Sequence, residues 1–205
     1  MTGRFTGWPE GAFDVLLQLD GEPSVAVREK WRKDRERLVR QPMIALFNSV
    51  ADADPAYEDF SVWGYGSMVW WWQHQFGIVR LPGRVELGVR FDLDGLEVSG
   101  GWMNGPLEPF RAAVAEESSG TQLVAILEDL QGKGFVISGG DLLKRGPHGY
   151  PADHPRAELL RYRRLTAGLP LGCEDWLHTA ETVDRVVAGF TELRPLMSWL
   201  GEHVL

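Results

Sequence analysis

The stretch RVELGVRFDLDGLEVSGGW, residues 84–102, decides the fold class of this chain. From Val85 to Phe91, apolar side chains alternate with charged or small ones, and this period of two is typical of a half-buried strand. The sequence DLDG at residues 92–95 is typical of a hairpin turn, and residues 96–102 supply the returning strand. We therefore predict two antiparallel strands joined by a tight turn.

The segments around this hairpin extend the sheet and then change to helix. A turn at Pro82-Gly83 predicts that residues 67–81 form the strand before the hairpin. Apolar residues recur at helical spacing toward both ends of the chain. Helices are predicted over residues 9–21, from Ser24 with an interruption at Pro42, from Leu107, from a cap at Thr121 to Gly132, from Thr179 and from Pro195, and extended segments over residues 135–139 and 165–171. The resulting fold class is α+β, a central antiparallel β-sheet at about residues 60–102 packed by N- and C-terminal helices in a single domain, residues 1–205.

The composition limits the partners of this chain. Its formal net charge of −8 opposes nucleic-acid binding, because phosphate contacts need a surplus of Lys and Arg. No apolar run approaches the roughly 20 residues of a membrane span, and the N-terminus lacks the apolar block of a signal peptide. We therefore predict a cytoplasmic protein with no membrane partner. Cys173 is the only cysteine, which excludes an intramolecular disulfide and a zinc site built from cysteines.

The charge is distributed unevenly along the chain. Residues 24–40 carry seven basic and three acidic side chains, and residues 142–164 carry six basic and two acidic ones. Each segment therefore has a net charge of +4 in a protein that is acidic overall. The two segments either border one anion site or form ordinary solvated faces, and the sequence leaves both interpretations open.

Three consecutive tryptophans precede the predicted hairpin, in GSMVWWWQHQFG at residues 66–77. In an extended strand, every second residue from Trp70 faces one way and every second residue from Trp71 faces the other. The first set, which includes His74, is typical of a core-facing stripe. The second set combines a ring that needs cover with two amides that need partners, so that it either packs under other parts of the protein or lines a ligand pocket. The candidate ligand-binding residues of this region are Trp63, Tyr65, Trp70, Trp71, Trp72, Gln73, His74, Gln75 and Trp102.

A second group of candidates lies in the loop KRGPHGYPADHP, residues 144–155. Its histidines and Asp153 have the side chains of a metal site or an acid–base pair, or they brace an irregular loop through bonds to its backbone. Their spacing matches no metal template, and we predict no metal site. The candidate ligand-binding residues here are Lys144, Arg145, His148 and His154, and no catalytic residue is assigned.

The familiar signatures of cofactor chemistry are missing from the sequence. There is no G-x-x-x-x-G-K-[ST] phosphate loop, no G-x-S-x-G elbow, no H-E-x-x-H zinc motif and no Rossmann glycine pattern. We therefore predict no cofactor.

Residues 142–165, LLKRGPHGYPADHPRAELLRYRRL, resemble a widespread bacterial family known as the domain of unknown function number twenty-four sixty-one. The resemblance extends to FTGWPEGAFDVLLQL at residues 5–19, which resembles the family's opening helix, and to the region from Trp31 to Pro42, which resembles its basic second helix. Residues 100–114, GGWMNGPLEPFRAAV, resemble a glycine-rich strand end and the helix after it. Residues 182–200 resemble the closing helices, so that the resemblance covers nearly the whole chain.

The chain departs from this family just before one strand. Family members carry R-x-x-R-D-x-R-F, then an Asp/Asn-Lys pair and a tyrosine, ahead of an H-F-G-like strand. Here the strand end reads QFGIV at residues 75–79, but FSVWGYGSMVWWW at residues 60–72 lacks those arginines, the aspartate and the lysine. The resemblance therefore transfers no site residue, and it implies that aromatic rings stand in place of a cationic cluster.

Three functions remain open from the sequence. The first, which we favour, is a binding or sequestering protein whose tryptophan-lined pocket holds an aromatic or cationic small molecule. The second is an enzyme of unknown reaction that uses the His/Asp loop and basic residues on an anionic substrate. The third is a protein-interaction module with an aromatic surface, whose partner includes a second copy of the chain in a homo-oligomer.

Overall fold

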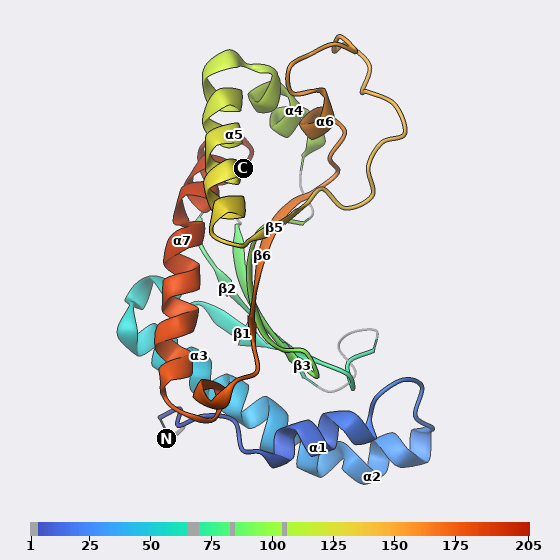
Figure 1. The fold of residues 1–205 in the computed structure, drawn as a ribbon, viewed down its shortest axis with the longest axis vertical. Coiled ribbons are helices and arrows are strands. Elements are labelled where there is room, and N and C mark those ends of the chain that lie inside the picture. The colour runs from blue at the N-terminus through green and yellow to red at the C-terminus, as the bar shows by residue number, and fades with distance from the viewer. Residues whose placement is uncertain (1–3, 65–69, 83–84, 104–105) are drawn as a thin grey trace. The chain divides into compact units, whose positions relative to one another are not determined.

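The predicted hairpin forms the middle of a six-stranded antiparallel sheet (Figure 1). The structure is a computed structural model that describes residues 4–64, 70–82, 85–103 and 106–205. The strands lie in the order β1-β2-β3-β4-β6-β5. Their bounds are β1 (Phe60–Val62), β2 (Gln75–Arg80), β3 (Glu86–Asp92), β4 (Gly95–Trp102), β5 (Val136–Ser138) and β6 (Leu165–Gly172). With helices at both ends of the chain, the fold class is α+β, as the sequence predicted.

The β3–β4 hairpin forms because its hydrophobic pattern and its turn agree. The apolar side chains of the alternating pattern are all buried, namely Val85, Leu87, Val89 and Phe91. In the turn, the backbone N–H of Asp94 donates to Oδ1 of Asp92 at 2.9 Å. Gly95 follows with a φ of +100°, and a Cβ at this position would lie 2.1 Å from the carbonyl oxygen of Gly172. Only glycine fits both the conformation and the space, and this fixes the register of the hairpin.

The strand predicted over residues 67–81 is wrong in its first half. Strand β2 begins at Gln75, and residues 70–73 form a turn in which the backbone N–H of Gln73 donates to the carbonyl oxygen of Trp70 at 3.0 Å. Trp70 has a φ of +58°. This left-handed conformation ends the alternation of a strand, so that the predicted two faces do not exist at Trp70 to Gln73. Residues 65–69 lie outside the described residues.

Along the chain, helices precede and follow the strands of this sheet. Their bounds are α1 (Gly11–Gln18), α2 (Val25–Arg35), α3 (Gln41–Ala53), α4 (Leu107–Ala115), α5 (Glu117–Gly132), α6 (Ala157–Leu160) and α7 (Glu181–His203), with short turns at η1 (Glu36–Arg40), η2 (Pro55–Tyr57) and η4 (Asp175–His178). The hydroxyl of Ser24 accepts the backbone N–H of Val27 at 3.3 Å, which confirms the predicted cap of α2. In the described part of the chain, every helix is too short or too polar to cross a bilayer.

The predicted interruption at Pro42 takes the form of a π-helical turn. In η1, the backbone N–H of Gln41 donates to the carbonyl oxygen of Glu36, five residues earlier. A proline lacks its own N–H, and its ring clashes with the carbonyl four residues before it. One wider turn accommodates the ring. The chain thus continues from α2 into α3 without a loop.

Two other predicted helix starts are wrong. Helix α5 begins at Glu117 rather than at Thr121, because the carboxylate of Glu116 accepts the backbone N–H groups of Ser118 and Ser119 at 3.0 and 2.6 Å. These bonds lower the pKa of Glu116 to about 2. Pro195 lies inside α7 instead of starting a new helix. A buried stripe before and after it holds both halves together, namely Phe190, Leu193, Leu196, Trp199 and Leu200.

The chain forms two compact units, and strands β3, β4 and β6 and helix α7 contribute residues to both. Unit 1 comprises Met1–Arg80, Gly88–Val98 and Pro170–Gly189, and unit 2 comprises Leu81–Leu87, Ser99–Leu169 and Phe190–Leu205. In unit 1, Trp8 stacks on Phe91 with ring centroids 4.5 Å apart. In unit 2, Trp102 stacks on Phe110 at 5.1 Å. Each unit therefore has an aromatic centre of its own, and the single domain stays a prediction.

Candidate functional site

The tryptophan turn, which we define as residues 70–75, lies in unit 1 and ends with the first residue of strand β2. Trp70 is 41% exposed, and its backbone has the left-handed conformation. A bulky residue in this conformation costs about 1–3 kcal/mol, and such strain persists only where surrounding contacts enforce it. The contacts around the turn therefore explain why its rings lie where they do.

A buried arginine from helix α2 fixes the tryptophan turn. The side chain of Arg35 is only 4% exposed, and its guanidinium donates to the carbonyl oxygens of Trp71 and of His74, the latter at 2.6 Å. It also donates to Oε1 of Gln75 at 3.3 Å. Its carbon Cζ lies 5.0 Å from the centroid of the Trp71 ring. One cation thus binds three residues of the turn.

Arg35 keeps its charge in an unusual setting. Burial lowers its pKa to about 10, so that the guanidinium is charged at neutral pH. Within the described residues, no carboxylate pairs with it and its Nε has no hydrogen-bond partner. The sequence reasoning placed this arginine only in a basic segment. Its spacing of four residues from Trp31 and from the buried Val39 is the signal that could have placed it on the inward face.

The amide of Gln75 is occupied by the protein itself. Its side chain is buried, and its Nε2 donates to the carbonyl oxygens of Trp63 and Phe76 at 2.9 and 3.1 Å. The guanidinium of Arg40 donates to the same Trp63 oxygen at 3.0 Å. The ring of Trp63 is half-buried and meets Phe76 edge-on. The Gln75 amide therefore joins the turn to the strand and is already engaged by the protein.

The other side of the turn is held by the loop that precedes α2. The indole N–H of Trp72 and the amide of Gln73 both donate to the carbonyl oxygen of Gly21, at 3.2 and 2.8 Å. The guanidinium of Arg28 lies 4.3 Å from the centroid of the Trp72 ring. Trp70 meets Trp72 edge-on with centroids 5.2 Å apart. We call the group of Trp70, Trp72 and Arg28 the aromatic–cation surface.

Two further residues of the turn, Trp71 and His74, are partly or wholly covered by the protein. Trp71 is buried beneath Trp72, with centroids 5.9 Å apart and planes at 90°. His74 is half-buried, and burial followed by the charges of Arg90 and Arg35 lowers its pKa, while Asp92 opposes the shift. The imidazole is therefore neutral at pH 7. Of the two other candidates, Trp102 lies in the core of unit 2, and Tyr65 is outside the described residues.

The loop 144–155 holds its candidates apart. Lys144, Arg145 and His148 are exposed. Nδ1 of His154 accepts the backbone N–H of Arg156 at 3.0 Å, which is the bracing role that the sequence left open. Among the described residues, no group of three or more His, Cys, Asp or Glu side chains is placed to hold a metal ion. The contact that the structure shows for a histidine side chain of this loop is thus the bond of His154 to the backbone.

Arg156, at the end of this loop, anchors the loop to the junction of α4 and α5, and the sequence alone did not single it out. Its buried guanidinium donates from Nε to the carbonyl oxygen of Val114 at 2.6 Å, and to the carbonyls of Ala115 and Glu116 at 3.1 and 3.2 Å. It also pairs with Glu117 at 3.0 Å. The carbonyls of Val114 and Ala115 are at the end of α4 and lack partners within that helix, whereas the carbonyl of Glu116 also accepts the backbone N–H of Gly120 in α5. Arg156 therefore closes α4 where α5 begins.

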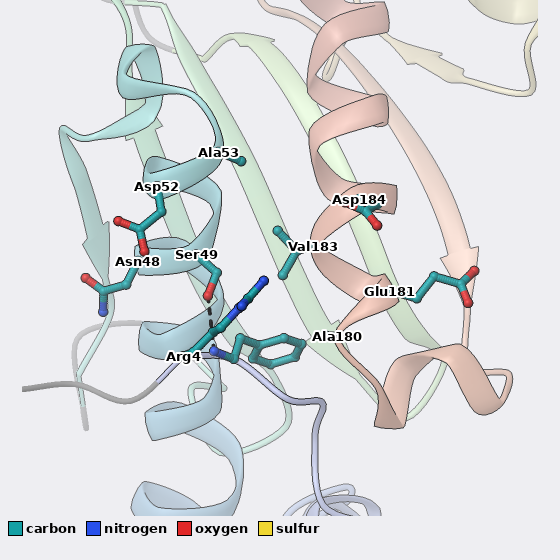
Figure 2. A pocket seen from close by; sticks show the side chains of 10 residues that line it. Arg4, Asn48, Ser49, Asp52, Ala53, Ala180, Glu181, Val183 and Asp184 are labelled. Carbon is teal, nitrogen blue, oxygen red and sulfur yellow. Dashed lines mark hydrogen bonds between the residues drawn. The ribbon is translucent and has the colours of Figure 1, made fainter.

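A polar hollow of about 660 Å³ lies in unit 1 between α3 and the first turns of α7. Figure 2 shows Asn48 and Asp52 on the α3 side and Glu181 and Asp184 on the α7 side, with Arg4 between them. The Oγ of Ser49 at its floor accepts the backbone N–H of Phe5 at 3.1 Å (Figure 2). The carboxylates on its rim are exposed, where hydration weakens their interactions. Its chemistry is that of a solvated groove with both signs of charge.

Comparison with known proteins places the chain in one family. No curated protein and no solved structure matches it. The family described as Conserved hypothetical protein (DUF2461) matches residues 90–199. This match includes the loop of Arg156 and begins after the tryptophan turn. It covers more than half of the chain and confirms the resemblance seen in the sequence, so that the protein belongs to the DUF2461 family of conserved hypothetical proteins.

Proposed function

We propose that this protein binds a small planar aromatic anion on the aromatic–cation surface of Trp70, Trp72 and Arg28. The observation that carries the proposal is the exposed Trp70, held in a left-handed conformation at the edge of a Trp72 ring that already bears the Arg28 guanidinium at 4.3 Å. An exposed ring offers a face for stacking, and the neighbouring cation offers N–H groups to a carboxylate.

The rigidity of the turn supports binding. Arg35 holds its backbone from one side, and the carbonyl oxygen of Gly21 holds Trp72 and Gln73 from the other. Ordering a flexible side chain on binding costs about 0.5–1.5 kcal/mol. Here the protein orders these groups when it folds, so that a ligand meets rings already in position.

The sequence favoured an aromatic or cationic small molecule, and the charge of the region supports an aromatic anion. Residues 24–40 have a net charge of +4, and in the described part of the chain no carboxylate forms an ion pair with Arg28. Arg32, one turn further along α2, pairs with Glu29 at 3.5 Å. Because Arg28 is stacked on a ring and not paired, its outward N–H groups remain available for a bidentate contact.

Nuclear magnetic resonance tests this proposal with three probes. The indole N–H signals of nine tryptophans report on the rings individually, once Trp70→Phe and Trp72→Phe assign two of them. We expect 2-naphthoate to shift the Trp70 and Trp72 signals in a saturable manner. We expect 2-naphthylmethylamine, which reverses the charge, and cyclohexanecarboxylate, which removes the planar ring, to bind these residues at least threefold more weakly.

Matched variants on one helix provide the control. Arg28→Gln should weaken 2-naphthoate binding about three- to tenfold, the effect of one partly exposed charge contact. Arg32→Gln, which removes an exposed charge of the same helix, should change it less than twofold. Equal binding of the naphthoate and the amine, or shifts confined to other tryptophans, would disprove the proposal. Shifts that depend on protein concentration alone would instead identify a second copy as the occupant.

A further inference from the structure

A second hollow lies in unit 2 and involves none of the residues discussed for the tryptophan turn. Its volume is about 470 Å³, within the range of about 300–1,000 Å³ that is typical of small-molecule sites. Helix α5 forms one wall, and strand β5 and residues 155–162 form the others. All of its lining residues fall within the part of the chain that matches the family.

Four aliphatic side chains line part of this hollow. Val124 and Leu127 line it from α5, Ile137 from β5 and Leu159 from α6. Leu127 is buried, and the other three are half-buried. Half-buried aliphatic side chains around a hollow leave apolar area that a ligand can cover, at a gain of about 25 cal/mol for each Å² removed from water.

The rim of the hollow is acidic. Glu128 and Glu158 line it and are exposed. In the described part of the chain, no ion pair or side-chain hydrogen bond engages either carboxylate. Among the described residues, Arg156 is the only cation that lines the hollow. Its guanidinium is bound to the end of α4 and to Glu117. Among the residues that the structure describes, these two carboxylates therefore have no counterion from the protein, and they lie beside the aliphatic part of the lining.

Tyr162 gives the hollow a fixed wall. A Cβ placed on Gly139 would lie 2.4 Å from the Tyr162 ring, so that the ring lies directly against the backbone of this glycine. Burial and then the negative charge of Glu158 raise the pKa of the Tyr162 phenol. The phenol therefore keeps its proton at neutral pH, beside the carboxylate of Glu158.

We propose that this hollow is a binding site for an amphipathic primary amine, a molecule with an ammonium group on a short apolar or aromatic body. The body covers Val124, Leu127 and Ile137, and the ammonium pairs with the carboxylates of Glu128 and Glu158. These carboxylates repel an anion, and a purely apolar ligand forms no ion pair with them. The site is independent of the surface proposed for aromatic anions, and each can fail without the other.

Methyl-group spectra of the protein, residues 1–205, test this site with 2-phenylethylamine as the probe. We expect saturable shifts of the Val124, Leu127 and Ile137 methyl signals. The alcohol 2-phenylethanol has nearly the same shape without the charge, and we expect it to bind at least tenfold more weakly. The double variant Glu128→Gln/Glu158→Gln should weaken amine binding at least tenfold.

The control variant is Asp141→Asn, which removes one exposed negative charge of unit 2 outside the hollow. It should leave amine binding within twofold of the original protein. Equal affinity for the alcohol, unchanged affinity in the double variant, or shifts confined to other methyl groups would each overturn the proposal. Methyl shifts that change with protein concentration before any amine is added would also overturn it, because a second copy would then cover the hollow.

Discussion

The tryptophan turn and the loop of Arg156 are each fixed by one buried arginine, but their charges are balanced differently. Arg156 pairs with Glu117 at 3.0 Å and donates to carbonyls that a helix end leaves without partners. Arg35 donates only to neutral oxygens, and its Nε has no partner among the described residues. The first lies within the residues that match the family, and the second lies before them.

This difference explains what each region does. A buried charge costs several kcal/mol unless it is well paired. In the Arg156 loop the cation is paired, and the result is a closed helix junction. In the tryptophan turn the cation is less well paired, and the turn it holds also contains a strained tryptophan. The protein thus maintains an unfavourable backbone conformation at Trp70, and this conformation leaves the Trp70 ring exposed and ordered.

The largest expected effect is that of removing Arg35. Arg35→Met leaves the oxygens of Trp71, His74 and Gln75 without their donor. An unsatisfied buried acceptor costs about 1–3 kcal/mol, so that we expect the free energy of unfolding to fall by about 3 kcal/mol or more. Urea unfolding followed by circular dichroism measures it. Arg32→Met is the control, with a change below about 0.5 kcal/mol, and a loss as small for Arg35→Met would refute its role.

The corresponding change in the other region should be smaller. Arg156→Met frees carbonyls of Val114 and Ala115 at a helix end, where Glu117 is exposed and water can reach some of the acceptors. We expect a loss of about 1–3 kcal/mol by the same urea measurement. Arg163→Met, an exposed neighbour, serves as the matched control. A loss clearly larger than that of Arg35→Met would reverse the comparison.

Trp70 should be a residue whose replacement stabilises the protein. Asparagine tolerates the left-handed conformation that costs most residues about 1–2 kcal/mol. We therefore expect Trp70→Asn to raise the free energy of unfolding by up to about 1 kcal/mol while it abolishes 2-naphthoate binding. Trp72→Asn should lower stability, because it removes the bond to Gly21 and the stack with Arg28. If Trp70→Asn destabilises as much as Trp72→Asn, the turn is not strained.

The smallest effect concerns pH and His74. Because the pKa of His74 is lowered in the folded protein, the unfolded chain binds the proton more readily. Its contribution to stability is therefore complete above the ordinary pKa of about 6.5 and is lost as the pH falls below that value. Urea unfolding between pH 7.5 and 5.5 should show a decline that His74→Gln reduces. An equal decline in the variant would show that another group is responsible.

The sequence predicted those parts of the fold in which local signals agree. In the β3–β4 hairpin, the alternation from Val85 to Phe91, the turn residues and Gly95 all favour the same structure. The capping of α2 by Ser24 follows from a local bond in the same way. The prediction for Thr121 was wrong although its signal was also local, because Glu116 provides a stronger cap five residues earlier.

The candidate site could not be predicted because its decisive contact is not local. A run of aromatic residues is compatible with a strand or with a turn, and the choice here depends on Arg35, 36 residues before Trp71. The sequence left Trp71 either packed under other parts of the protein or lining a pocket, and the structure buries it, whereas Trp70, which the alternation placed on the core-facing stripe, is the exposed ring. The contact of Trp72 with Arg28 was missed as well, because Arg28 reaches the turn from helix α2, far from it in the sequence.

Quenching of tryptophan fluorescence by small ions tests the central claim most directly. If Trp70 is exposed next to the Trp72 ring that carries the Arg28 guanidinium, iodide should quench the original protein more strongly than caesium, since the local positive charge attracts the anion. This difference should shrink in Trp70→Phe and in Arg28→Gln but persist in Arg32→Gln. Equal quenching by the two ions, with no change in Trp70→Phe, would show that no exposed ring stands beside a cation and would contradict the account.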